Sequence, residues 1–240
     1  MVTDQNSFII LAMTMKFLLS LLLVCFCSCN DNKDSSVKAE KDTTIYKAGE
    51  VVRPSVSYES FIAACKAQVI NLRKQNKPQQ LQEVIYQIIA EKMPVYWHGT
   101  AWDFNGTTRI AGKESIACGY FITTILEDIG LKISRNKMAQ KPSSVLIKAT
   151  CSNVKNYATI QQLQDYLSNI PSNTILIVGL DFHTGFIIKE KDSIYFFHSN
   201  YIGKQGVVKE AIEMSRALNK SKSFMIGILS RNNNYITKAL

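Results

Sequence analysis

The chain has 240 residues, of which 46% are hydrophobic and 20% charged, and its 28 lysines and arginines outnumber 19 aspartates and glutamates, for a formal net charge of +9. This length and composition suit one globular domain with a sizeable core. They exclude a collagen-like protein, a disordered protein and a membrane protein with many spans.

The first 29 residues have the pattern of a signal peptide. Lys16 precedes an apolar run over residues 17–26, which is typical of secretion and too short for a bilayer span of roughly 20 apolar residues. Met15 is the better start for such a signal. Cys29 follows a small residue and precedes a polar stretch, which resembles a bacterial lipoprotein signal, in which that cysteine is lipidated and becomes the new N-terminus. A plain signal peptide or an uncleaved anchor is the alternative.

Residues 30–53 mix both charges without an apolar face, which predicts a flexible, solvated linker. The folded domain is therefore expected over 54–240, with an N-terminal helical part over 54–93. Residues 41–240 hold 25 basic and 15 acidic groups, a net charge of +10. This surplus favours an anionic partner. Because no zinc-finger spacing or RNA-binding signature accompanies it, we expect a cell-envelope polyanion rather than nucleic acid.

Two helices are predicted over 57–75 and 79–93, where apolar residues recur at three- and four-residue steps. Pro94 is expected to end the second helix. A loop rich in aromatic residues and glycine is expected over 96–106. The next predicted helix begins at residue 114 or 115 and runs to 128.

The rest of the chain changes character after one more amphipathic helix. β-branched and aromatic runs alternate with polar residues, which is typical of strands. The predicted elements are a short strand within 142–154, a helix over 159–170, strands over 174–180, 182–189 and 193–199, a helix over 210–218 and a last strand over 224–230. Helices followed by an antiparallel meander indicate an α+β domain, with helices packed on one face of an antiparallel sheet.

Cys118 lies in the first turn of the helix predicted to end at 128. Unpaired N–H groups and partial positive charge at a helix N-terminus favour a thiolate and offer donors to an oxyanion. The alternative is a small buried hydrophobic residue, the usual role of free cysteine. Cys65 and Cys151 lack this setting, and their pairing in a disulfide cannot be deduced from sequence.

Two histidines extend this candidate site. His183 opens one predicted strand and His198 closes the next, so a turn between them would bring both to the same end of a hairpin. Contacts from a thiol to an imidazole, and from that imidazole to an orienting polar group, are the arrangement of nucleophilic catalysis. A structural role is the alternative for each histidine. His98 is expected to be an ordinary loop residue. The three histidines are not spaced as the ligands of a zinc site are.

In their order, these residues resemble the NlpC-type cell-wall cysteine peptidases over roughly residues 94–200. The matching motifs are Tyr96-Trp97 with Gly99, the helix-starting Cys118-Gly119-Tyr120-Phe121, His183 with Gly185, and Phe197-His198-Ser199. The resemblance implies a papain-like α+β fold in which Cys118 is the nucleophile, His183 the general base and His198 the residue that orients His183. It also implies that Tyr96 flanks the nucleophile near the oxyanion hole.

The chain departs from the family pattern at three points. The family usually has Asp-Cys-Ser-Gly where this chain has Ala117-Cys118-Gly119-Tyr120, and residues 171–175 replace the usual Pro-Gly-Asp-Leu turn without its glycine and aspartate. Residues 131–170 are longer than the usual connection, and we expect them to form a lid or a wall of the cleft.

The resemblance implies an exported cysteine hydrolase that cleaves amide bonds in peptidoglycan stem peptides without a cofactor or metal. Its partners would be peptidoglycan or its muropeptide fragments and, through a lipid on Cys29, a membrane of the bacterial cell envelope. Two alternatives remain open. One is an inactive, lipid-tethered module that binds the cell wall, and the other is an amidase or acyltransferase that uses the same residues on a non-wall substrate.

Overall fold

Six antiparallel strands form the frame of the computed structural model, which describes residues 54–238. The strand order is β1-β6-β2-β3-β4-β5. The strands β2 to β4 form the predicted meander, β5 extends it by a strand that the sequence did not predict, and β6 and β1 extend the sheet beyond β2. The strands are β1 (Ser152–Tyr157), β2 (Thr174–Gly179), β3 (Thr184–Lys189), β4 (Ile194–Asn200), β5 (Gly206–Ala211) and β6 (Phe224–Ile228).

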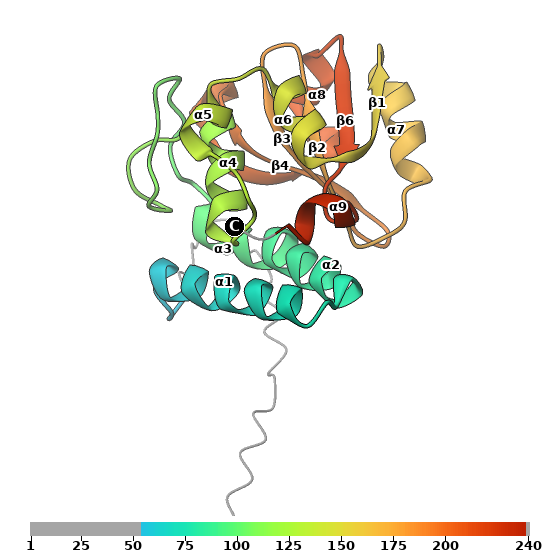
Figure 1. Cartoon of the computed structure of the whole chain (residues 1–240). Coiled ribbons are helices and arrows are strands. Elements are labelled where there is room, and N and C mark those ends of the chain that lie inside the picture. The colour runs from blue at the N-terminus through green and yellow to red at the C-terminus, as the bar shows by residue number, and fades with distance from the viewer. Residues whose placement is uncertain (1–53, 239–240) are drawn as a thin grey trace, which may run out of the picture. The chain divides into compact units, whose positions relative to one another are not determined.

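Helices cover the sheet and fill the N-terminal part of the domain. Figure 1 shows α1 and α2 lying together below the sheet, with α4 and α6 in front of its strands. The helices are α1 (Tyr58–Lys74), α2 (Pro78–Gln87), α3 (Met93–Trp97), α4 (Cys118–Asp128), α5 (Arg135–Ala139), α6 (Ser143–Thr150), α7 (Ile160–Ser168), α8 (Arg216–Lys220) and α9 (Asn233–Ile236), with a π-helical turn, η1 (Ile88–Lys92), and the 3₁₀ turns η2 (Ile202–Lys204) and η3 (Ile212–Met214).

Both faces of the sheet are buried. Side chains alternate along a strand, so Ile175 and Ile177 of β2 pack in one core with α1, α2, α4 and α6. Leu176 and Val178 pack in a second core with α7 and α8. The predicted α+β class with helices on an antiparallel sheet is confirmed, but the expectation of helices on one face only is wrong. The apolar side chains of β2 point to both faces of the sheet, so helices must pack on each face to bury them.

The first predicted helices are confirmed, but Pro94 does not end the second. The chain continues from α2 through η1 into α3, and Pro94 stands in the first turn of α3. An amide has no partner within its own helix at that position, so proline is tolerated there. The expected aromatic loop therefore begins after Trp97.

The helix that carries Cys118 begins later than predicted. Ala117 is extended, and Ile116 donates its N–H to Ala101 O while its own carbonyl accepts from the Ser199 hydroxyl. These bonds hold the preceding residues against other segments, so that α4 begins at Cys118 itself.

Two other predicted elements are wrong. Residues 142–154 form mainly a helix, α6, and β1 begins only at Ser152. Where a helix was expected over 210–218, the strand β5 runs to Ala211, and α8 begins only at Arg216. Pairing with β4 over the whole length of β5 outweighs the helical spacing of the apolar residues after Glu210.

The segment after α3 closes the sheet edge at β5. Gly99 donates its N–H to Val207 O, and Val207 donates its own N–H to Thr100 O. Gly206 has a positive φ and approaches the Thr100 carbonyl so closely that a side chain would collide with it. A strand edge that would otherwise present free backbone groups is thus covered.

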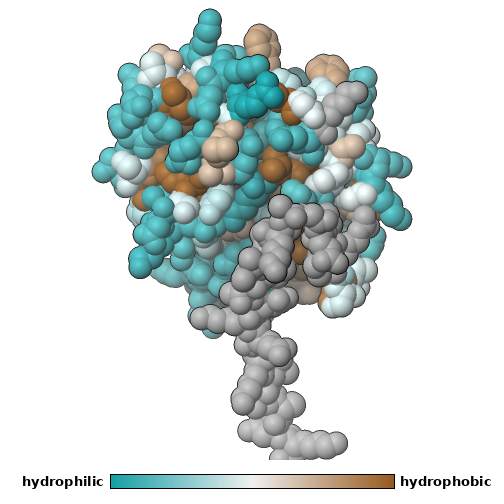
Figure 2. Space-filling model, turned by 180° about the vertical axis from the view of Figure 1, so that it is seen from behind, coloured by the Kyte–Doolittle hydropathy of each residue, from teal (hydrophilic) through white to brown (hydrophobic). Residues whose placement is uncertain are grey.

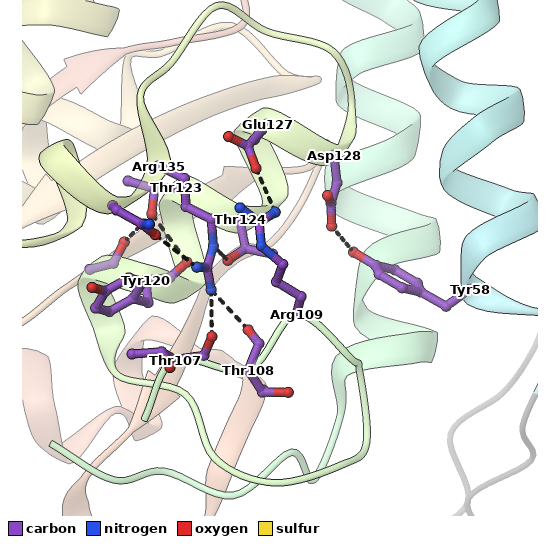
Figure 3. Close-up of polar contacts among 12 residues, drawn as sticks. Tyr58, Thr107, Thr108, Arg109, Tyr120, Thr123, Thr124, Glu127, Asp128 and Arg135 are labelled. Atoms are coloured by element: carbon purple, nitrogen blue, oxygen red, sulfur yellow. Dashed lines mark hydrogen bonds and ion pairs between the residues drawn. The ribbon is translucent and has the colours of Figure 1, made fainter. Parts of the chain in front are cut away.

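Buried polar contacts fix α4 against its surroundings (Figure 3). Arg135 donates to the carbonyls of Thr107 and Thr108 and, at 2.7 Å, to the Thr124 hydroxyl on α4. On the opposite side of α4, the Tyr58 hydroxyl donates to Asp128 at 2.7 Å. These contacts hold the loop over 98–117 and the helix α1 against the helix that presents Cys118.

Seen from behind (Figure 2), the described surface is mostly hydrophilic, with separate small hydrophobic areas. Between residues 54 and 238, no helix combines the length and apolarity that a membrane crossing requires. The expected leader with Cys29, and the linker over 30–53, lie outside the described residues.

Candidate active site

The start of α4 places Cys118 at the mouth of the site. Ala117, the residue before the helix, makes no side-chain capping bond, so the amides of the first turn have no cap. The backbone N–H groups of Cys118, Gly119 and Thr184 act to lower the pKa of the Cys118 thiol. Cys118 thus combines a nucleophilic atom with nearby backbone donors.

Burial nevertheless raises the pKa of the Cys118 thiol, and the lowering effect of the three backbone N–H groups only partly offsets it. The sequence predicted a thiolate favoured by the helix start. In the structure, removal of the sulfur from water outweighs this local field, so the resting group is a thiol.

His183 and His198 are in direct contact, as the hairpin predicted. His183 Nε2 and His198 Nδ1 lie 2.7 Å apart, and both rings are buried. His198 stacks on Phe196 with ring centroids 4.0 Å apart, and His183 meets the edge of the same ring. This apolar support leaves the two imidazoles little freedom to turn.

Gly185 makes this packing possible. The β3–β4 register places Gly185 opposite His198, and a Cβ at position 185 would lie 2.7 Å from His198 Cβ and would also collide with the Phe196 ring. Only glycine leaves the room that the second imidazole occupies.

Glu210 is a site residue that the sequence analysis did not single out. Its Oε1 lies 3.1 Å from His198 Nε2, and 17% of its side chain is exposed. The residue went unnoticed because 210–218 was predicted as a helix, whereas the strand β5 places Glu210 next to His198 across the sheet. Val207 and Val208, two β-branched residues just before it, are the sequence signal that favours a strand here.

Burial sets the charge state of the imidazoles. It lowers the pKa of His183 well below its ordinary value, and the neighbouring His198 lowers it further. Burial also lowers the pKa of His198, although Glu210 acts in the opposite direction. For Glu210, burial would raise the pKa, but hydrogen bonds with His198 and Ser215 outweigh it and lower the pKa. The resting site therefore holds neutral imidazoles beside an ionised carboxylate.

Cys118 and His183 line one pocket of about 520 Å³. The other walls come from residues 138–146, the β2–β3 turn over 179–184 and residues 223–225. Among the described residues no hydrogen bond joins the two side chains; catalytic contacts of this kind often tighten only when the substrate binds. Part of the long connection over 131–170 forms a wall of this pocket, as expected.

The rim and wall of the pocket offer contacts of different chemistry. Phe182 is 94% exposed beside His183, and Lys141 supplies a cation from the segment between α5 and α6. Gly119 allows the end of α5 to approach, because a Cβ at position 119 would collide with the Ala139 carbonyl. Glycine at position 119 thus has a steric reason in this chain.

Tyr96 is not brought to the nucleophile. Its hydroxyl donates to Val56 O at 3.2 Å, its ring stacks on Phe61 with centroids 4.7 Å apart, and it does not line the pocket. The ring that lies close to His183 is instead Tyr201, at 5.1 Å between centroids. His98 is exposed at the end of α3.

The other two cysteines of residues 54–238 are free and buried. Burial raises the pKa of Cys65 to about 11 and that of Cys151 to about 12. The disulfide that the sequence left open is thus not formed. Within the same residues, no three histidine, cysteine, aspartate or glutamate side chains are grouped to hold a metal ion.

Comparisons with protein-family models, with curated proteins and with solved structures give no match to this chain.

Proposed function

We propose that this protein is an exported cysteine hydrolase, related to the NlpC-type peptidases and papain-like in fold, that cleaves amide bonds in peptidoglycan stem peptides. The observation that carries the proposal is the shared pocket of Cys118 and His183, with His198 bonded behind His183. The basic surface expected from the sequence and the cation of Lys141 suit a substrate that carries carboxylates.

The charge states favour proton transfer during the attack rather than before it. As the Cys118 sulfur bonds to the substrate carbonyl carbon, its proton passes to His183. The amides at the start of α4 stabilise the oxyanion, and protonated His183 then gives its proton to the leaving amine. Water, deprotonated by His183, releases the acyl group from the sulfur and restores the thiol.

The test is incubation of the full chain with purified muropeptides, followed by mass spectrometry. The wild type should release a stem-peptide fragment, and both Cys118→Ser and His183→Gln should lose this activity. Cys65→Ala is the matched control, because it removes a buried thiol outside the pocket and should retain activity. Muropeptides left intact by the wild type would argue against peptidoglycan hydrolysis.

The burial of the Cys118 thiol favours one rival, a module that binds the wall without cutting it, since a raised pKa makes a weaker nucleophile. Binding of muropeptides that is equal for the wild type and Cys118→Ser, without any product, would favour this rival. An amidase or acyltransferase with a non-wall substrate would instead form an acyl-enzyme on Cys118 with simple thioesters while muropeptides stay intact.

We further propose that lipid on Cys29 holds the protein in the bacterial envelope. The proposal rests on the lipoprotein-like leader. Growth of expressing cells with a labelled fatty acid should label the wild type and not Cys29→Ala. Equal labelling of both proteins would argue against lipidation at Cys29.

A further inference from the structure

Three polar side chains form a diagonal row across β5, β4 and the start of β3. Glu210 pairs with Phe196 in the β4–β5 register, two residues before His198. The pairing of Phe186 with Phe197 brings Gly185, two residues after His183, next to His198. Diagonal neighbours of this kind lie on the same face of a sheet and within reach of long side chains. The row runs from a partly exposed carboxylate to an imidazole in the Cys118 pocket.

The hydrogen bonds in this row determine which nitrogens carry protons. An ionised carboxylate only accepts, so the 3.1 Å contact with Glu210 requires a proton on His198 Nε2. Neutral His198 then has a lone pair on Nδ1, and the 2.7 Å contact requires His183 Nε2 to donate to it. The lone pair of His183 therefore lies on Nδ1, the nitrogen that the row leaves free to act as a base.

We propose that Glu210 is a positioning residue of the hydrolase: by accepting from His198 it fixes the tautomers of both histidines and leaves Nδ1 of His183 as the base that takes the Cys118 proton. The inference rests on the proposed function for its catalytic meaning. Its structural content, the tautomer of each imidazole, is testable without any substrate.

The same row stabilises the charge that appears during the reaction. When the Cys118 proton reaches Nδ1, His183 becomes an imidazolium that still donates through Nε2 to His198. No second proton has to move, because the negative charge of Glu210 acts through neutral His198. The proton leaves His183 later with the departing amine.

The surroundings of Glu210 fit this role. Ser215, which is fully buried at the start of α8, acts together with His198 to keep the pKa of Glu210 low. The cation next to it in sequence, Lys209, does not neutralise it: Lys209 bonds Glu190 at 2.7 Å and the Ala90 carbonyl on the other side of the sheet. The carboxylate therefore has His198 as its imidazole partner and keeps its charge.

The test is nitrogen-15 NMR of the full chain with labelled histidine, which reports the proton on each ring nitrogen. The chain has three histidines, so single His→Gln variants assign every signal. Wild type should carry the proton on Nε2 in both His183 and His198. Glu210→Leu should add a population with the proton on Nδ1, whereas Glu210→Gln, whose amide oxygen still accepts, should keep the wild-type tautomers.

Glu190→Gln is the matched control, since it removes a carboxylate in the turn after β3 that bonds a lysine and no imidazole. It should leave both imidazole spectra unchanged. A proton on Nδ1 of either histidine in the wild type overturns the proposal, and so does a Glu210→Leu spectrum identical to the wild type. Glu210→Ala replaces Glu210→Leu if circular dichroism shows that the leucine variant is unfolded.

Hydrolysis of muropeptides then separates this inference from the proposed function. We expect Glu210→Leu to lower kcat about 10- to 100-fold, as loss of a residue that orients a functional histidine does elsewhere, and Glu210→Gln to recover part of that loss. If the wild type shows the expected tautomers and does not cleave muropeptides, the proposed function is refuted and the role of Glu210 in fixing the tautomers is not. Full activity of Glu210→Leu together with unchanged tautomers refutes the role of Glu210 alone.

Discussion

Gly185→Ala tests whether the histidine pair depends on the packing of the sheet beneath it. The added Cβ would lie 2.7 Å from His198 Cβ and would also collide with the Phe196 ring, which is fully buried. Neither neighbour has free space to move into, because His198 is also fully buried and stacks on Phe196. Overpacking of this kind costs about 1–3 kcal/mol of unfolding free energy.

For a domain of this size, that cost corresponds to a fall in Tm of about 2–12 °C. The collision should also push His198 away from His183. We expect the nitrogen-15 signals of both imidazoles to shift and muropeptide hydrolysis to fall by at least about tenfold, since positioning losses of about 1 Å have large effects on rate.

The matched control is Gly227→Ala in β6. A Cβ there would lie 2.5 Å from Cys151 Cβ and 3.1 Å from Ile147 Cγ2, a similar collision that involves neither histidine. Gly227→Ala should lower Tm to a similar extent and leave the imidazole signals in place. The reasoning is refuted by a Gly185→Ala protein with the Tm and the imidazole signals of the wild type.

Three further predictions concern stability and thiol chemistry. Tyr58→Phe should lower the unfolding free energy in urea by about 1–3 kcal/mol, because the buried indole N–H of Trp97 loses its 2.9 Å acceptor; an unchanged midpoint would contradict this. Iodoacetamide should label Cys118 slowly at pH 6 and roughly tenfold faster for each pH unit upward, since burial raises its pKa; fast labelling at pH 6 would instead show a resting ion pair. Burial lowers the pKa of His183 and of His198, so below pH 6.5 the unfolded chain binds protons that the folded chain does not. The unfolding free energy should therefore fall as the pH decreases, by up to about 1.4 kcal/mol per pH unit for each histidine. His183→Gln should reduce this slope between pH 7.5 and 5.5, and equal slopes would exclude the histidine as its source.

Several elements were predictable from local patterns in the sequence. The helix α7 has the expected type because its apolar residues recur at helical spacing, and the strands β2 to β4 because each is a short run of β-branched and aromatic residues bounded by polar ones. The strand β5 was missed because the residues after Glu210 also fit a helix, and only pairing with β4 decides between the two. The early start predicted for α4 failed for a related reason, since contacts with distant segments keep Ile116 and Ala117 extended.

The candidate site was predictable in its residue types but not in its connections. Motif order brought Cys118 and His183 together as candidates, and the structure places both in one pocket. The link to Glu210 depends on the register of two strand pairs, which no local pattern specifies. Tyr96 shows the converse, because its place in a motif says nothing about the direction in which α3 turns its side chain.

The backbone hydrogen bonds between residues 99–100 and β5 have a consequence for the order of folding. They join a segment that follows the N-terminal helices to a strand near the end of the chain, and the pocket likewise brings Cys118 together with His183 and with residues 223–225. Contacts so distant in sequence form late, because loop closure must precede them. A nascent chain therefore carries its cysteine long before it carries His183 and His198, and the pocket is complete only after residues 223–225, which line it, have been made.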